Sequence, residues 1–331
     1  NDFGTVDYFA VQTLTTGIFS IWLESYDPGG AAQLAVLAAL IVAGLLGVEK
    51  IGRRRARFHK SGRQLAPIQP QPLSSRQGAA VLLYCLVPMG LGFLIPLMVL
   101  VAPVVSDLSL WSDTGLWRAA AHSLALGGAS AGLVVTLATV MVLGLQKTPA
   151  AWKKSLLTLT TVGYAFPGAV LGLGILIPLA TFDNWLADLV FATFRRDPGL
   201  LLTGSAGALI VAYCVRFFAI GVGAAEAGLA AISTNIPLAA STLGRGPKDV
   251  LVNIYQPLMR GSLASAMVLV FVDTVKELPA TLLLRPFNFD TLSTHVYAQA
   301  SLENFHGSTP AALLIITLSL GAIFLLAKAH R

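Results

Sequence analysis

The sequence predicts an all-α, polytopic membrane protein with about seven transmembrane helices. Of its 331 residues, 55% are hydrophobic and only 11% are charged, against about 25% charged residues in a soluble domain. The mean hydropathy of +0.75 leaves too little polar surface to coat a water-soluble fold. The two cysteines, Cys85 and Cys214, lie in apolar stretches, which indicates core side chains rather than a disulfide or a zinc site.

Seven apolar segments approach the roughly 20 residues that a helix needs to cross a bilayer. They are expected at residues 31–48, 79–101, 119–145, 156–180, 200–223, 262–284 and 310–327. Within the fourth segment, Phe166-Pro167-Gly168 predicts a break in the helix, which is tolerated where neighbours or a cavity satisfy the freed carbonyl. Because such breaks often mark pathways, Pro167 is a candidate pathway residue.

The basic residues predict which way the spans point. The first span is followed by a run of Lys and Arg between residues 50 and 63, which places that loop in the cytoplasm. Alternating sides from there puts most other basic residues and the carboxyl terminus inside. The exceptions, which are expected on the outer side of the membrane, are Arg118, Arg195, Arg196 and Arg285. The net charge of +6 therefore indicates contact with anionic lipid and not a nucleic-acid partner.

An internal repeat is predicted from residues 12–19 and 290–297, which match in kind position by position. We expect residues 1–63 to be the end of a first repeat, 64–78 a proline-rich cytoplasmic linker, and 79–331 a second repeat of six spans. In this interpretation the first repeat is truncated and about 200 of its residues are absent. In both copies the last span runs from the outer side of the membrane to the cytoplasmic side. The repeats are therefore expected to be parallel, with a pathway between them.

A long cytoplasmic connection at residues 229–261 joins the fifth and sixth spans. Ala239 and Ala240 permit close approach of another surface, Gly244 supplies a turn, and Pro247 suits a first helical position, so two short helices are expected. An apolar stripe at helical spacing follows, formed by Val250, Leu251, Ile254 and Leu258. An apolar face outside the membrane needs a partner.

This connection resembles the EAA loop of binding-protein-dependent ABC importer permeases, in which Ala-Ala, a Gly four residues later and a late Ile-x-x-Pro recur. The resemblance implies a type I permease fold and an ATPase-coupling loop. Its residues here are Leu238, Ala239, Ala240, Leu243, Gly244, Ile254 and Pro257. Leu238 departs from the pattern, because the family usually has Glu there, and this puts a salt bridge from this loop to the ATPase in doubt.

The same resemblance implies the partners and the location. These are two copies of a separate ABC ATPase that binds ATP and Mg, a periplasmic solute-binding protein, the lipid bilayer and the missing first permease half. We expect the chain itself to bind no cofactor and to lie in the bacterial inner membrane with its carboxyl terminus in the cytoplasm. No Gly-Lys dipeptide occurs, so the chain has no P-loop and is not expected to be an enzyme.

The segment Lys276-Glu277-Leu278-Pro279-Ala280 and its continuation to Leu292 is similar to the fused two-repeat permeases of ferric-iron importers, as are residues 2–9 and 163–168. This similarity covers the whole chain and implies ferric iron as the solute. Fused permeases for thiamine or another small solute share the architecture, so they stay open as alternatives. A secondary transporter driven by an ion gradient is the alternative of another class.

Ionisable residues within the sixth span are candidates for a pathway or a gate, because charges in a membrane are expensive and usually functional. Spacing places Asp273, Lys276 and Glu277 on one side of a helix. The repeat pairs Glu277 with Asp2, and we hypothesise that both acids line or gate the pathway near its outer end. The structural alternative is that Asp273 and Lys276 neutralise each other while Glu277 caps a turn at Pro279.

Two further sets of polar residues carry structural interpretations. Arg216, in the fifth span, is expected near the cytoplasmic end, where its side chain can snorkel to the surface. His122, His295 and His306 are expected near the outer face as solvated loop residues. No two of these histidines have ligand spacing on one helix, so no metal site is assigned.

Overall fold

The computed structural model describes residues 3–55, 72–233 and 235–329. Within these ranges every regular element is a helix, and seven helical segments are long and apolar enough to cross a membrane, which confirms the predicted fold class and number of spans. The helices that carry these seven segments are α3 (Pro28–Arg55), α4 with α5 (Ser75–Met89 and Ile95–Ser106), α6 (Thr114–Gly144), α8 (Gly168–Phe194), α9 (Ala206–Ala230), α12 (Gln256–Val275) and α15 (Phe305–Ala329).

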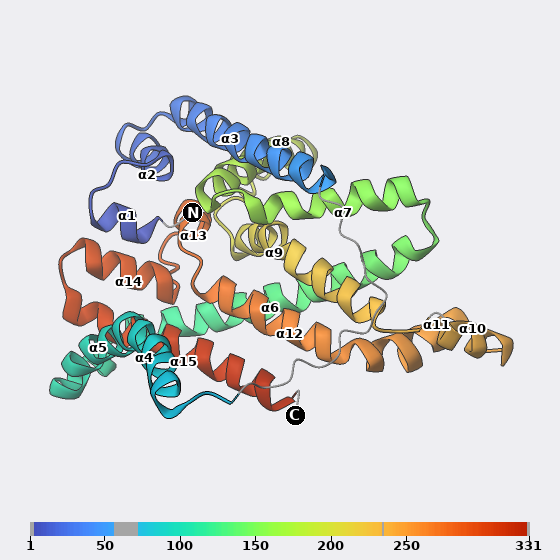
Figure 1. The fold of residues 1–331 in the computed structure, drawn as a ribbon. Helices are drawn as coiled ribbons and strands as arrows, with labels where there is room; N and C mark the ends of the chain where they lie inside the picture. Colours follow the sequence, from blue (N-terminus) through green and yellow to red (C-terminus); the bar gives the residue numbers. More distant parts are fainter. Residues whose placement is uncertain (1–2, 56–71, 234, 330–331) are drawn as a thin grey trace.

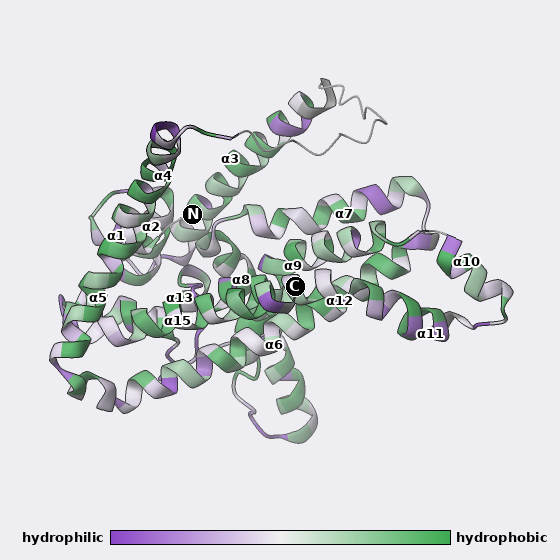
Figure 2. Ribbon diagram, turned by 60° about the horizontal axis from the view of Figure 1, so that its bottom comes forward, coloured by the Kyte–Doolittle hydropathy of each residue, from purple (hydrophilic) through white to green (hydrophobic). Residues whose placement is uncertain are grey.

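Three of the long helices, α6, α9 and α12, pack together in the centre of the fold (Figure 1). Small residues bring them close: a Cβ atom at Gly221 of α9 would lie 2.9 Å from the Cβ of Ala138 in α6. The outer helices α4 and α5 instead consist mostly of hydrophobic residues, as the colours of Figure 2 show, and most of their large apolar side chains are exposed. In the apolar stretch of 18 residues that identifies α4 and α5 as a span, no residue is buried. Such a surface suits lipid as its solvent.

The fourth predicted span consists of two helices. The break predicted at Pro167 is confirmed: α7 (Ala150–Ala165) ends there and α8 begins at Gly168. Phe166 and Pro167 both have extended backbone, as expected for a proline and the residue before it. Because α7 packs against α9 while α8 packs against α13 (Pro279–Leu284), the break distributes this segment over two neighbours.

The sixth span ends earlier than predicted. α12 ends at Val275, and residues 276–278 separate it from the short helix α13, which begins at Pro279. A proline within a helix removes one backbone hydrogen bond and clashes with the preceding turn. Hydropathy does not register this effect, so the predicted span ran on to Leu284. The fifth span is also displaced, because α9 begins only after its N-cap Ser205.

A buried carboxylate fixes the connection that leads into α9. Asp183 of α8 is fully buried and accepts hydrogen bonds from the backbone N–H groups of Leu201, Leu202 and Thr203, at 3.0, 2.9 and 2.7 Å. These bonds satisfy donors that would otherwise be unpaired in a loop without regular structure. The loop between α8 and α9 is therefore held in one conformation from within the protein.

Two helices that the predicted repeat relates begin in the same way. α2 (Leu14–Phe19) and α14 (Leu292–Ser301) each start with a reciprocal capping box, formed by Thr13 with Thr16 and by Thr291 with Thr294. In both boxes the N-cap N–H donates to the second threonine at 2.8 Å. The division into residues 1–63, 64–78 and 79–331 stays a prediction. α4 starts at Ser75, inside the predicted linker, most of which lies outside the described residues.

The contact between α7 and α9 leads to a prediction about Gly163. A Cβ atom at Gly163 would lie 2.2 Å from the carbonyl oxygen of Val215, so the two backbones meet without room for a side chain. We expect Gly163→Ala to destabilise the protein by about 1–3 kcal/mol through overpacking, as measured by unfolding in mixed micelles. Gly174→Ala is the matched control, because a Cβ there meets nothing within 4 Å. Equal stability of the two variants would contradict this packing.

Candidate functional site

A buried ion pair joins the interrupted segments in the middle of the protein. Arg216 lies near the middle of α9, and its Nε atom is 3.0 Å from Oε2 of Glu277, which follows the end of α12. Both side chains are nearly inaccessible, with exposed fractions of 11% and 7%. Arg216 also donates from Nη1 to the carbonyl oxygen of Phe166, at 3.2 Å. One guanidinium group therefore holds the break between α7 and α8 and the break between α12 and α13.

The other oxygen of the Glu277 carboxylate caps the following helix. Oε1 accepts a hydrogen bond from the backbone N–H of Ala280 at 3.3 Å, in the first turn of α13. The backbone at Gly168 is in contact with the same group, and a Cβ there would lie 2.5 Å from Oε1 of Glu277. Because both carboxylate oxygens are engaged and the side chain is buried, Glu277 has no oxygen directed to an open passage.

Buried hydroxyl groups extend this cluster from α9 to α14. The hydroxyl of Tyr213 lies 2.6 Å from Oγ1 of Thr281, and Thr281 in turn donates to the backbone carbonyl of Glu277 at 2.6 Å. Ser293 of α14 donates to the same carbonyl at 2.8 Å. Hydrogen-bond networks in a low-dielectric interior are strong when every member is satisfied. The non-helical residues between α12 and α13 are thus fixed from three sides.

The structure separates the residues that the sequence grouped in the sixth span. Asp273 and Lys276 form an ion pair of 2.8 Å, as the structural alternative proposed, and the Lys276 side chain is 60% exposed. Glu277 turns inward instead of sharing their side, because the helix has already ended. The predicted cap at Pro279 is confirmed in the contact of Glu277 with Ala280. Asp2 lies outside the described residues, so its pairing with Glu277 stays a prediction.

The prediction that Arg216 snorkels to the cytoplasmic surface is wrong, because its side chain is buried against Glu277. Sequence reasoning treated the two charges separately, since 61 positions separate residue 216 from residue 277 in the chain. A signal was nevertheless present. Opposite charges on two neighbouring spans, each costly in a membrane, are expected to find each other.

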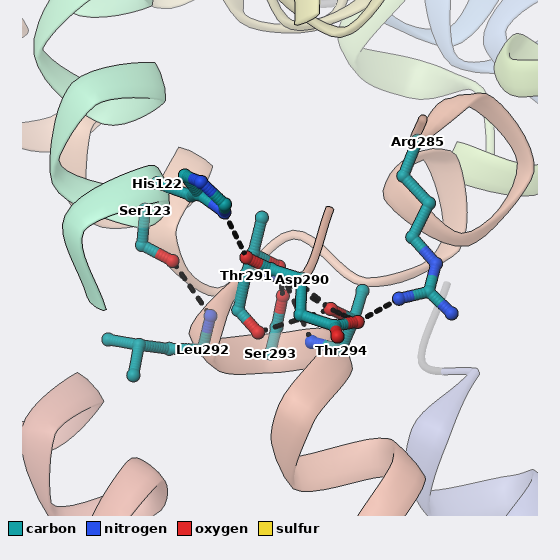
Figure 3. Close-up of polar contacts among 8 residues, drawn as sticks. All are labelled: His122, Ser123, Arg285, Asp290, Thr291, Leu292, Ser293 and Thr294. Atoms are coloured by element: carbon teal, nitrogen blue, oxygen red, sulfur yellow. Dashed lines mark hydrogen bonds and ion pairs between the residues drawn. The ribbon is translucent and has the colours of Figure 1, made fainter. Parts of the chain in front are cut away.

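A second set of polar contacts ties α6 to the turn before α14 (Figure 3). Nδ1 of His122 lies 2.9 Å from the carbonyl oxygen of Asp290, and Ser123 accepts from the N–H of Leu292 at 2.8 Å. Asp290 forms an ion pair with Arg285. His122 also stacks on Phe289, with ring centroids 3.9 Å apart. This histidine is therefore a packing residue.

The histidines do not gather in a cluster. His295 is largely buried, with an exposed side-chain fraction of 11%, and lies 3.7 Å from the carboxylate of Asp113. The interpretation of the histidines as solvated loop residues is thus wrong for His295, and also for His122, which lies within α6 and packs on Phe289. Among the described residues, no three His, Cys, Asp or Glu side chains are placed to hold a metal ion.

A cavity of about 370 Å³ lies between the helices α1 (Gly4–Tyr8) and α14. Its lining includes Asp7, Tyr297 and Glu303, and the Tyr297 hydroxyl donates to Oδ2 of Asp7 at 3.0 Å. Burial, with a smaller effect of the Asp7 carboxylate, raises the pKa of Tyr297. The phenol therefore stays protonated at neutral pH and can serve as the donor. This contact joins the two parts of the chain that the predicted repeat relates.

The connection between α9 and α12 projects from one end of the molecule, far from α1 and α14 (Figures 1 and 2). It contains α10 (Asn235–Thr242) and α11 (Pro247–Val250), which confirms the two predicted short helices. Gly244 lies between them with φ at +81°, a conformation that favours glycine. The expected turn at Gly244 and the expected helix start at Pro247 are therefore present.

Two leucines of this connection are unusually exposed, Leu238 at 64% and Leu243 at 82%, while Ala240 is buried. Ala239 is exposed, and Ile254 and Pro257 lie beyond the turn, where the chain enters α12. The predicted apolar stripe is only partly formed. A π-helical turn at Leu251–Tyr255 changes the register, so Val250 is buried while Leu251 and Leu258 are exposed. The two most exposed leucines of the connection thus belong to α10 and its end, while further exposed apolar side chains follow α11.

Comparison with known proteins shows which proteins this chain is similar to. No protein-family model matches the chain. In sequence the chain is 27% identical to the Fe(3+)-transport system permease protein FbpB 2 of Haemophilus influenzae, over 99% of its own length. The chain is therefore similar in sequence to an Fe(3+)-transport permease over nearly its whole length. It spans 62% of the length of that relative.

Other similarities concern permeases as well. A putative 2-aminoethylphosphonate transport system permease protein, PhnV of Salmonella typhimurium, is 24% identical over 62% of this chain and 71% of its own length. A chain of a bacterial alginate ABC transporter, solved in complex with an alginate-bound periplasmic protein, superposes with a TM-score of 0.62 at 15% identity, covering 76% of this chain and 93% of that one. The fold is therefore that of an ABC importer permease, as the resemblance of the loop predicted.

These similarities also bear on location and class. The seven apolar helices of the described ranges, together with the similarity to permease proteins, support a multi-pass protein of the inner membrane. The relatives carry the names of permease proteins, which agrees with a chain that is not itself an enzyme. The residues of the coupling loop and of the candidate gate stay predictions, because a likeness in fold assigns no role to single side chains.

Proposed function

We propose that the chain is the transmembrane permease component of an ATP-driven importer, and that its solute is ferric iron delivered by a periplasmic binding protein. The observation that carries this proposal is the similarity to an Fe(3+)-transport permease over 99% of the chain. The partners are two copies of an ABC ATPase, which bind ATP and Mg, and a first permease half encoded with this chain. The carboxyl terminus lies in the cytoplasm, on the side of the basic loops.

In this proposal, α10 and the turn after it form the coupling loop. Its apolar side chains Leu238 and Leu243 are exposed on a segment that projects beyond the spans. Burying Leu243 in a groove of the ATPase would contribute about 25 cal/mol for each Å² of apolar surface removed from water. Nucleotide-driven movement of the ATPase then moves α10. The π-helical turn Leu251–Tyr255 and α12, which follow one another without a break, carry that movement toward Glu277.

The ion pair of Arg216 and Glu277 then serves as part of the gate. It joins the break after α7 to the end of α12, so a shift of α12 must either carry α8 with it or separate the pair. Glu277 acts through this ion pair and not as an iron ligand, since both its oxygens are engaged. Asp273 and Lys276 neutralise each other beside it.

A permease for an organophosphonate is the second candidate function, because the similarity to PhnV covers 62% of the chain. A thiamine permease, which the sequence left open, has no such observation in its favour. The likeness to an ABC transporter argues against an ion-gradient transporter of another fold.

Uptake into proteoliposomes tests the proposal. The assembled transporter, its ATPase and its binding protein are reconstituted, and uptake of radiolabelled ferric iron is compared with uptake of 2-aminoethylphosphonate, each with and without ATP. We expect iron uptake only with ATP. Uptake of the phosphonate alone would favour the second candidate, and iron uptake without ATP would overturn the ATP-driven mechanism.

A further inference from the structure

A groove of about 700 Å³ runs between α6 and α12. Its lining is mostly apolar and includes Val140, Leu143, Met259, Leu263 and Met267. The two threonines in its wall, Thr136 and Thr139, donate their hydroxyl protons to carbonyl groups of their own helix, at 2.7 Å each. Their polar atoms are therefore satisfied, so the wall is apolar in its chemistry as well as in its composition.

One end of the groove is polar. Arg260 and Gln256 of α12 line it there. Arg260 is exposed, and no carboxylate in the described part of the chain is within ion-pair distance of it. An arginine without a protein counter-ion at the mouth of an apolar groove suits a ligand with an anionic head and an apolar tail.

The position of Arg260 near one end of the spans indicates which kind of ligand the groove can bind. α6 contributes its last turns to the groove and ends at Gly144, and just beyond, Gln146 accepts a hydrogen bond from the hydroxyl of Tyr255 at 3.2 Å. The groove therefore lies at the same end of the helices as α10 and α11. This step rests on the proposed function, in which that end of the helices faces the cytoplasm. The groove then meets the headgroups of the cytoplasmic leaflet.

We infer that this groove is a binding site for an anionic phospholipid of the cytoplasmic leaflet. One acyl chain lies between α6 and α12, and the phosphate pairs with the guanidinium of Arg260. Basic pockets between transmembrane helices on the cytoplasmic side are suited to anionic headgroups. A free phosphate ion would satisfy Arg260 and leave the apolar walls uncovered, whereas a lipid covers both.

Native mass spectrometry of the purified full-length protein in its native assembly tests this site, with added phosphatidylglycerol or phosphatidylcholine as the probe. We expect retained phosphatidylglycerol in the wild type. Arg260→Gln should lower its retention relative to phosphatidylcholine by about fivefold, the effect of one basic residue near an anionic surface. Ala264→Trp, which fills the groove, should remove both lipids.

Lys154→Gln is the matched control, because Lys154 is an exposed basic residue of α7 that does not line the groove. Equal losses in Arg260→Gln and Lys154→Gln would overturn the site, and so would a wild type that retains no lipid. Inorganic phosphate that competes as well as the lipid would reduce the site to an anion site. Iron uptake is measured on the same preparations, so a failed lipid site with intact uptake is distinguished from a failed transport function.

Discussion

Replacing Arg216 by Met, or Glu277 by Gln, is expected to destabilise the protein by about 3–5 kcal/mol, because each change leaves the partner charge buried without compensation. The two side chains have exposed fractions of only 11% and 7%, so water cannot replace the lost partner. Arg216→Met also removes the donor to the Phe166 carbonyl and frees the break between α7 and α8. Unfolding by denaturant titration in mixed micelles measures the loss.

The double variant Arg216→Met with Glu277→Gln separates folding from gating. Replacing both charges of a buried pair by uncharged groups of similar size is often neutral for stability, and Gln at position 277 keeps an oxygen for the N–H of Ala280. We therefore expect the double variant to recover most of the stability that each single variant loses, and to fall short of the wild type by about 1 kcal/mol for the lost hydrogen bond to the Phe166 carbonyl. ATP-driven uptake should nevertheless fall by about tenfold or more, which corresponds to about 1.4 kcal/mol in the barrier.

Uptake at the wild-type level in the folded double variant would contradict the gate and leave the ion pair a purely structural role. A control away from the cluster is the exposed pair of Asp273 and Lys276, whose lysine side chain is 60% exposed. Exchanging Lys276 for Gln should change stability by less than about 1 kcal/mol and leave uptake unchanged.

The elements that the sequence predicted correctly are those whose cause is local. Seven apolar runs produce seven spans, Pro167 breaks a helix, and Gly244 and Pro247 shape the projecting turn. Each of these follows from the residue itself: apolar length, a missing N–H group, or freedom to adopt a positive φ.

The elements that the sequence missed depend on contacts between distant segments. Spacing groups Glu277 with Lys276 only in an uninterrupted helix, whereas Pro279 ends α12 early and turns the carboxylate toward Arg216. The π-helical turn at Leu251–Tyr255 likewise shifted the stripe that helical spacing predicted. Hydropathy records neither a change in helix register nor the identity of a partner 61 positions away.

The same substitution at two leucines of the coupling loop is expected to have opposite effects. Leu243→Glu places a charge on the most exposed leucine of the loop, 82% accessible, where docking on the ATPase would bury it. If Leu243 is one of the few hot-spot residues that dominate an interface, its loss costs about 2 kcal/mol or more, which is a weakening of about 30-fold. We expect the ATPase subunit to be lost during purification and ATP-driven uptake to disappear with it. The fold should be unaffected, since the side chain has almost no contacts within the chain.

Leu238→Glu, five positions earlier and 64% exposed, introduces the residue that EAA loops usually carry at this place. The added carboxylate should therefore be tolerated, and it should retain or strengthen binding of the ATPase through a charge-assisted contact. Co-purification of the ATPase with each variant measures both effects. General intolerance to charge on an exposed apolar loop would impair the two variants alike, and a loop with no ATPase contact would leave both unchanged. Only a docked α10 with the register of an EAA loop separates Leu238 from Leu243.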